Sequence, residues 1–597
     1  MRIRFRNPAV LLWIVLSLLA ASPSWAQAGN EPARRLTPRG TDNLVAFTRL
    51  LGYVRFFHPS DQAAAANWDS LAIAGVQAAE RATNPRDLAV TLEDFFQPVA
   101  PTVRVFPTGT RPDLPAELAP PSGVGNPEIT AWAHFGVGLN NGNTVYRSNR
   151  ATSRGAPPSG LPLPGEPLVV DLGGGVSAQI PLTLYKETQG NTIPRVSPDV
   201  QPPTPDKPEG WIPSGNDRAT RLANVALSWT IFQHFYPYFD AVRVDWNAEL
   251  RKGLTGAATA KDERAFVDVL RRLVAALQDG HGFVNHRSQG LEAQLPLVWD
   301  WIQNQLVITH ADPARAAELS RGDVVLAING RPARQVYLAE EKLVSGATPQ
   351  WRRWIALQTL LAGAREEEVR LKVRRSNGKV TTVVVRRSPF EGSLTEPRPE
   401  KVAEVRPGIF YIDVDRVNDN DFRGVLDRLA SARGIIFDFR GYPSDLSTIF
   451  YQHLATAPLR TAFFNVPQVT RPDRVGIQYE DGGWSVPPLT PRFPAKVAFL
   501  TDGRAISKAE TYMGIVEHYR LGEIVGEATA GTNGNVNSFR LPGNYFVSWT
   551  GMQVLKHDGS RHHGVGIRPT VPVTRTLKGV AAGRDELLEK AIEVVSR

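Results

Sequence analysis

Hydrophobic residues recur at helical spacing in two similar stretches of the chain. Residues 44–59 (LVAFTRLLGYVRFFHP) and 222–237 (LANVALSWTIFQHFYP) both predict amphipathic helices, and they lie 178 positions apart. Trp68 follows the first stretch at the same interval as Trp246 follows the second. A further helix is expected in each copy, around Leu88–Phe96 and Phe266–Leu277. The pattern predicts a duplicated helical module.

Strand-like alternation appears between and after these helical stretches. Residues 127–192 hold short alternating runs with glycine turns, among them Leu168–Leu172 and Ile180–Leu184. Residues 193–210 are rich in proline and predict a semi-rigid linker. Further on, residues 321–332 (RGDVVLAINGRP) predict a hairpin with an Asn-Gly turn, preceded by a short helix at Ala314–Leu319.

The last 190 residues or so alternate short apolar strands with helices. Strands are expected at Gly408–Val414, Gly434–Phe439, Lys496–Leu500 and Glu523–Gly526, and helices at Asp421–Ala432 and Ser507–Tyr519. Such alternation predicts a layered α/β fold. With the helical and β-rich parts before it, the chain is expected to be a multidomain α+β and α/β protein.

The N-terminus has the pattern of a secretory signal peptide. Three arginines precede the apolar run Ala9–Ala21, and Ser24-Trp25-Ala26 supplies small residues before a cleavage point at Ala26. An uncleaved membrane anchor is the alternative, although the run is short for a bilayer span. We therefore expect an exported protein, periplasmic in a Gram-negative bacterium or secreted, without a stable membrane span after cleavage.

Composition narrows the classes of function. The 597 residues are 42% hydrophobic, which excludes a disordered chain, and the absence of cysteine excludes a cysteine nucleophile, thiolate zinc sites and disulfides. Removal of the three arginines of the signal peptide leaves 65 basic against 59 acidic residues, too small an excess to predict nucleic-acid binding. No zinc-protease or phosphate-loop motif is present, so neither a metal nor a cofactor is expected.

A candidate nucleophile lies where a strand gives way to a helix. In residues 501–510 (TDGRAISKAE), Ser507 stands at the expected helix start, where free N–H groups and the helix dipole can stabilise an oxyanion. On local sequence alone, a serine at this position is more often a helix cap.

Four motifs resemble those of the C-terminal processing (tail-specific) and tricorn-type serine peptidases. They are Ser507-Lys508-Ala509-Glu510 for SAxE, residues 525–531 (VGEATAG) for VGExTxG, residues 435–441 (IIFDFRG) for the strand ending in DLRGNGG, and residues 564–569 (GVGIRP) for GIxPD. Residues 321–332 are also similar to a stretch of PDZ domains, which capture extended peptides. The resemblance covers roughly residues 218–597, and it implies a serine peptidase acting on polypeptides.

The residue patterns, together with the resemblance over residues 218–597, predict an order of domains. These are a signal peptide (1–26), an N-terminal domain with one helical copy and a β region (27–192), a Pro-rich linker (193–217), a helical module with the DGH motif (218–292), a PDZ-like domain (293–390) and a crotonase/ClpP-like layered α/β catalytic core (400–597).

Two branches of the family differ in their general base. Where the Ser–Lys branch has its lysine, this chain has Thr532. The tricorn branch takes a histidine from the helical module instead, and its counterpart here is His281 in Asp279-Gly280-His281. The resemblance therefore implies Ser507 as nucleophile and His281 as base. In the first helical copy Val103 stands in place of His281, so we expect a structural or substrate-positioning role for that copy.

The remaining site residues follow from the same resemblance. The backbone N–H groups of Lys508 and of Ser444 or Gly441 would form the oxyanion hole, and Asp279 or His563 would orient His281. The oxyanion loop departs from the family pattern, because it has residues 441–445 (GYPSD) in place of Asn and successive glycines. Two other functions stay open on the sequence. One is a non-catalytic ligand- or peptide-binding protein on the same fold, and the other is a hydrolase of a non-peptide amide or ester.

Overall fold

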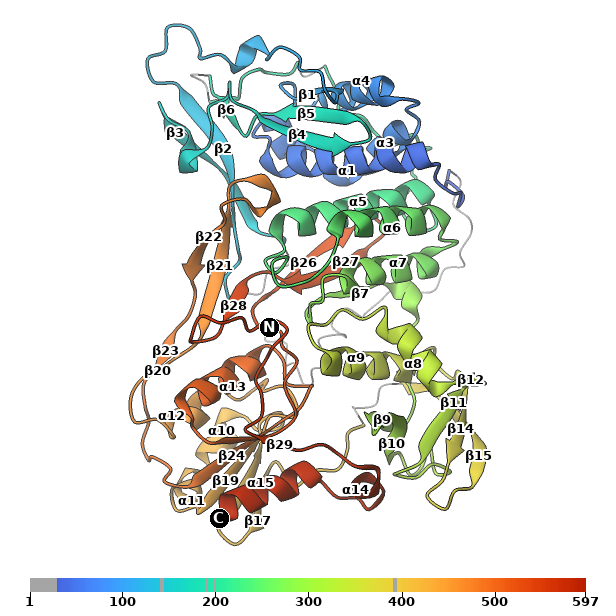
Figure 1. Cartoon of the computed structure of the whole chain (residues 1–597), viewed down its shortest axis with the longest axis vertical. Helices are drawn as coiled ribbons and strands as arrows, with labels where there is room; N and C mark the ends of the chain where they lie inside the picture. Colours follow the sequence, from blue (N-terminus) through green and yellow to red (C-terminus); the bar gives the residue numbers. More distant parts are fainter. Residues whose placement is uncertain (1–28, 140–143, 188–189, 198, 390–393) are drawn as a thin grey trace.

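The structure is a computed structural model that describes residues 29–139, 144–187, 190–197, 199–389 and 394–597 (Figure 1). The expected signal peptide, 1–26, lies outside the described residues. Among the described helices, none is long and apolar enough to cross a membrane. The molecule is a mixed α/β, multidomain protein.

Two sets of helices lie one above the other in the upper half of Figure 1. The first set is α1 (Pro38–Phe57), α2 (Asp61–Ala65), α3 (Trp68–Glu80) and α4 (Pro85–Phe96), and the second is α5 (Arg218–Phe235), α6 (Trp246–Thr259) and α7 (Glu263–Ala275). Helices α3 and α6 begin at equivalent positions because Asn67 and Asp245 cap them with their side chains. A single hydrophobic core contains residues of both sets.

The N-terminal β region forms two sheets. Its strands are β1 (Arg104–Pro107), β2 (Glu128–Phe135), β3 (Arg147–Arg154), β4 (Leu168–Gly173), β5 (Val176–Ile180) and β6 (Thr183–Tyr185). Strands β1, β5 and β4 make one sheet, and β2 pairs with β3 and β6 in the other. The strand expected at 180–184 is interrupted, because Pro181 has no N–H to donate to a ladder. No helix or strand occurs in the described residues of the linker 193–217.

The region after the second helical set has two sheets and two helices (Figure 1, lower right). Its elements are β8 (Ala293–Gln294), β9 (Leu297–Ile302), β10 (Gln305–Ala311), β11 (Val324–Ile328), β12 (Arg331–Pro332), α8 (Ala333–Glu341), α9 (Pro349–Leu361), β13 (Ala362–Gly363), β14 (Glu368–Arg374), β15 (Val380–Arg386) and β16 (Ser388–Pro389). One sheet consists of β9–β12, β14 and β15, and the other consists of β8, β13 and β16. Strands β11 and β12 form the expected hairpin. The helix expected at Ala314–Leu319 is absent from this described segment, which instead makes isolated turns such as the Ala316 N–H donating to the carbonyl of Asp312.

The C-terminal core is a six-stranded sheet with helices on both faces. Its strands, in spatial order, are β17 (Val402–Arg406), β18 (Ile409–Asp413), β19 (Gly434–Asp438), β24 (Lys496–Thr501), β25 (Glu523–Gly526) and β29 (Val571–Pro572). All neighbours are parallel except β17 and β18. The flanking helices are α10 (Asp419–Arg423), α11 (Leu426–Ala430), α12 (Ile449–Gln452), α13 (Lys508–Tyr519), α14 (Leu577–Ala581) and α15 (Glu586–Ser596). The single helix expected at Asp421–Ala432 is wrong, because the chain breaks at Gly424 into α10 and α11.

Further strands connect the C-terminal core with the N-terminal region and with the second set of helices. They are β20 (Leu459–Arg460), β21 (Phe463–Val469), β22 (Gln478–Asp481), β23 (Ser485–Val486), β26 (Val536–Leu541), β27 (Tyr545–Thr550) and β28 (Gln553–Leu555). Strand β21 pairs with β2 of the N-terminal region. Hairpin β26–β27 pairs with β7 (Phe283–Asn285), which follows the DGH motif directly. This pairing positions the site.

Candidate active site

Ser507 lies at the junction of strand β24 and helix α13. Its backbone has φ 58° and ψ −114°, a combination that a non-glycine residue adopts only under strain of about 1–3 kcal/mol. Among the described residues, no helix N–H donates to the Ser507 side chain as a cap. The helix-cap explanation of this serine therefore does not apply, and its half-buried hydroxyl is available for other contacts.

Thr532 joins the nucleophile turn to the DGH motif. Its carbonyl accepts the Ser507 N–H at 2.9 Å, and its hydroxyl accepts the Gly280 N–H at 3.0 Å. Gly280 is packed so closely that an added Cβ would lie 2.7 Å from Thr532 Oγ1 and 3.1 Å from Ile506 Cδ1. The residue before Ser507 and the residue before His281 are therefore neighbours.

A chain of three polar side chains holds His281 in place. Its Nδ1 lies 2.9 Å from Thr550 Oγ1, and the Thr550 hydroxyl donates to Asp279 Oδ1 at 2.6 Å. Asp279 is fully buried and also accepts the backbone N–H of His281 and of Thr550. Because a threonine hydroxyl has one proton, which here donates a hydrogen bond to the carboxylate, its oxygen accepts a hydrogen bond from the Nδ1–H of His281. This arrangement leaves Nε2 as the unprotonated nitrogen.

His281 is neutral near pH 7. Burial lowers its pKa below the ordinary 6.5, and the carboxylates of Asp279 and Glu510 partly oppose that effect. A neutral imidazole with a free Nε2 is the form that accepts a proton.

Glu510 organises the loop opposite Ser507. It is buried on helix α13, and its carboxylate accepts the N–H of Gly531 at 2.7 Å and of Thr532 at 2.8 Å, together with the Thr529 hydroxyl. His562 Nε2 lies 3.4 Å from the same carboxylate. In the sequence, Glu510 is recognisable only as the last residue of the motif Ser507–Glu510. Its spacing from the glycine-containing loop at Gly531 was the one pattern that could have indicated its structural role.

Residues 441–445, which are expected to form the oxyanion loop, follow the end of strand β19. The Ser444 N–H donates to the Tyr442 carbonyl at 2.7 Å, so it is engaged within the loop. The Lys508 ammonium donates to the Ser444 carbonyl at 3.2 Å. Gly441 is buried against Asp415, where an added Cβ would lie 2.7 Å from Oδ2.

His563 lies behind the site. It stacks on Tyr238 with ring centroids 4.1 Å apart. Burial lowers its pKa to about 4, while the Asp279 carboxylate opposes that shift. His563 is thus a neutral neighbour of Asp279, and the hydroxyl that touches the His281 ring belongs to Thr550, which the sequence analysis did not identify.

Helix α9 is fixed directly onto these loops. The Thr348 hydroxyl donates to the Ala530 carbonyl at 2.8 Å, and the Gln350 amide donates to the Thr529 carbonyl at 2.7 Å. The Ser345 hydroxyl accepts the Asp279 N–H at 2.9 Å. The start of α9 therefore braces both the DGH motif and the loop after β25.

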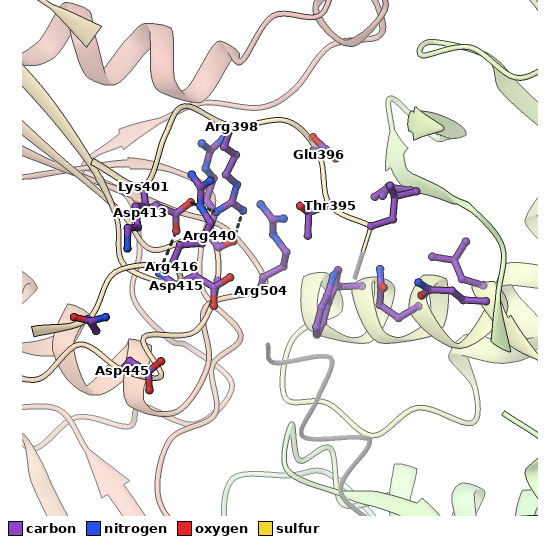
Figure 2. Close-up of a pocket in the computed structure, with 18 of the residues that line it drawn as sticks. Thr395, Glu396, Arg398, Lys401, Asp413, Asp415, Arg416, Arg440, Asp445 and Arg504 are labelled. Carbon is purple, nitrogen blue, oxygen red and sulfur yellow. Dashed lines mark hydrogen bonds and ion pairs between the residues drawn. The ribbon is translucent and has the colours of Figure 1, made fainter. Parts of the chain in front are cut away.

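A cavity of about 830 Å³ separates α9 from the core (Figure 2). Figure 2 shows Arg398, Arg440 and Arg504 on the core side, facing Thr395 and Glu396 of the segment before β17. The described lining residues include Gly441 but not Ser507, so the cavity adjoins the oxyanion loop. Within the described part of the chain, no group of three or more histidine or acidic side chains is placed to hold a metal ion.

Two ion pairs hold the oxyanion loop from the cavity side. Arg440 pairs with Asp438 at 2.7 Å and with Asp585 at 2.8 Å. Burial alone would raise the pKa of Asp438, but Arg440 and Arg398 hold it well below its usual range. These buried charges anchor the base of the loop.

Comparison with known proteins agrees with this geometry. Residues 408–573 match the model of peptidase family S41, so this part of the chain is a domain of that family of serine peptidases. The structure of mature CPAF complexed with lactacystin is 14% identical with a TM-score of 0.50, and the match covers 63% of this chain and 97% of that one. The photosystem II D1 C-terminal processing protease is 15% identical with a TM-score of 0.36, covering 61% and 97%. No curated protein sequence matches the chain. The likeness to CPAF shows the fold.

Proposed function

We propose that the protein is an exported serine peptidase that hydrolyses peptide bonds in extended polypeptides. Ser507 attacks the scissile carbonyl, and His281 Nε2 accepts its proton and returns it to the leaving amine. The backbone N–H groups of Lys508 and Gly441 stabilise the oxyanion.

The observation that carries this proposal is the hydrogen-bonded series Asp279, Thr550 and His281 beside the Ser507 turn. A serine hydroxyl needs a neighbouring base to act near neutral pH. Asp279 fixes the tautomer of His281 through Thr550 and stabilises the imidazolium when it forms, as the aspartate of a catalytic triad does directly. A serine held in a strained backbone without a capping role fits the same chemistry.

The other parts of the chain have supporting roles in the proposal. The PDZ-like region at 293–390 guides an extended chain to the site, because its helix α9 contacts the catalytic loops. The first helical copy is structural, because it shares a core with the second and lacks a histidine at Val103. A signal peptide at 1–26 directs export.

The test is hydrolysis of an unfolded polypeptide, such as reduced and alkylated casein, by the purified mature chain. We expect cleavage by the wild type and loss of at least about 10³-fold in kcat for Ser507→Ala. Ser548→Ala is the control, since its hydroxyl donates to the His281 carbonyl and not to the ring. Equal cleavage by the wild type and Ser507→Ala contradicts the proposal.

A further inference from the structure

A tyrosine hydroxyl stands beside Ser507 where a substrate oxygen would be held. The Tyr442 hydroxyl is within hydrogen-bonding reach of the Ser507 side chain and of the backbone N–H of Lys508. Its half-buried ring packs on a small apolar cluster formed by Trp351 and Ile506 with their neighbours. The ring is thus held from the core and from helix α9 together.

The backbone of the same loop has few donors left for an oxyanion. The Arg440 N–H donates to Asp438 at 2.9 Å, and the Ser444 N–H donates to the Tyr442 carbonyl at 2.7 Å. The Tyr442 N–H is bound by the Asp415 carboxylate. Pro443 has no N–H. The Gly441 N–H is the remaining backbone donor of residues 441–444, and the group of this loop that contacts Ser507 is the phenol hydroxyl.

We propose that the Tyr442 hydroxyl is an oxyanion-hole donor, acting with the backbone N–H of Lys508. The inference deepens the proposed function and rests on it. Without substrate, the Lys508 N–H reaches the Tyr442 hydroxyl. When a scissile carbonyl enters, the Lys508 N–H and the Tyr442 O–H both donate to its oxygen, and neither gives up its proton.

The protonation state of Tyr442 suits this role. Burial raises its pKa above the ordinary 10, and the Ser507 and Lys508 contacts oppose that effect only in part. The hydroxyl therefore remains a neutral donor across the working pH range. A donor fixed by packing needs no reorganisation when negative charge develops, which is the source of oxyanion stabilisation.

The substitution Tyr442→Phe removes the donor and keeps the ring. We expect kcat to fall by about 10²–10³-fold with KM changed little, as for loss of one oxyanion donor. Labelling of Ser507 by a fluorophosphonate should slow in parallel, because the phosphonyl oxygen occupies the same position. Tyr451→Phe is the matched control, since the hydroxyl of this buried tyrosine of α12 has no hydrogen-bond partner among the described residues.

The outcomes distinguish a failure of the proposed role of Tyr442 from a failure of the proposed peptidase function. If Tyr442→Phe or Tyr442→Gly turns over as fast as the wild type or faster, the hydroxyl is an obstacle in the site and the inference is overturned, while the peptidase stands. If the wild type neither cleaves polypeptide nor labels at Ser507, the proposed function fails and this inference fails with it.

Discussion

Replacing the Thr550 hydroxyl with a methyl group separates His281 from Asp279 while the volume of the side chain is kept. For Thr550→Val we expect kcat/KM to fall by about 10–100-fold, because the imidazole loses the partner that fixes its tautomer. Steady-state kinetics measure it. Thr48→Val is the control, since its buried hydroxyl bonds only to its own helix at Leu44. An unchanged kcat/KM for Thr550→Val would show that the hydrogen bonds from Asp279 through Thr550 to His281 do not contribute to catalysis.

The dependence of activity on pH reports the protonation state of the His281 imidazole. The active form of His281 is neutral, and burial lowers its pKa, so kcat/KM should rise with pH through a midpoint below 6.5 and be constant above it. Activity is therefore lost only as the pH falls through that lowered pKa. A profile of kcat/KM from pH 4.5 to 8 checks it, and a midpoint above 6.5 contradicts it.

The residues of the site differ in how far the sequence predicts them. Ser507 and His281 lie in recognisable motifs, and their assignment as nucleophile and general base remains a prediction. Thr550 could not be found, because it lies 269 residues from His281 and only the pairing of β27 with β7 brings the two together. At position 442 the sequence shows a tyrosine where the family motif has an asparagine, but the direction of the tyrosine side chain depends on packing against α9.

At the scale of elements, the contact between the DGH motif and the nucleophile turn is tight enough to test. Gly280→Ala would place a methyl group 2.7 Å from Thr532 Oγ1, which forces the two segments apart. We expect kcat to fall by at least about 10-fold through misplacement of the base, with a cooperative melting curve retained.

Gly125→Ala is the matched control for this test, because nothing lies within 4 Å of the added methyl group and its φ is not positive. A Gly280→Ala variant with wild-type kcat would show that the separation of the two segments does not matter for the reaction.

The elements themselves follow the sequence where the pattern is regular. The core strands near 409, 434, 496 and 523 begin within a residue or two of expectation. The helices expected at 44–59, 222–237, 88–96 and 266–277 are α1, α5, α4 and α7, and each begins about three to six residues earlier than expected. The failures are local: Gly424 breaks a helix, and Pro181 interrupts a strand. The pairing of β2 with β21 was not predictable, because edge strands carry no signal of their distant partners.

At the scale of the whole molecule, the N-terminal region is part of the folded body. One apolar core spans α1, α3–α7 and hairpin β26–β27, and β2 extends a sheet through β21 (Figure 1). We expect a chain that starts at residue 196 to be insoluble or to lack a cooperative melting transition, because it exposes the face of α5. Calorimetry checks it, and a truncated chain with wild-type melting and turnover contradicts it.

The most direct test of the account is kcat on an unfolded polypeptide for the wild type, Ser507→Ala, His281→Ala and the double variant. Because the two residues act as one unit, each single variant should lose nearly as much as the double, by at least about 10³-fold, and the losses should not add. Full turnover in His281→Ala, or losses in the two single variants that multiply in the double variant, would contradict the pairing of Ser507 with His281.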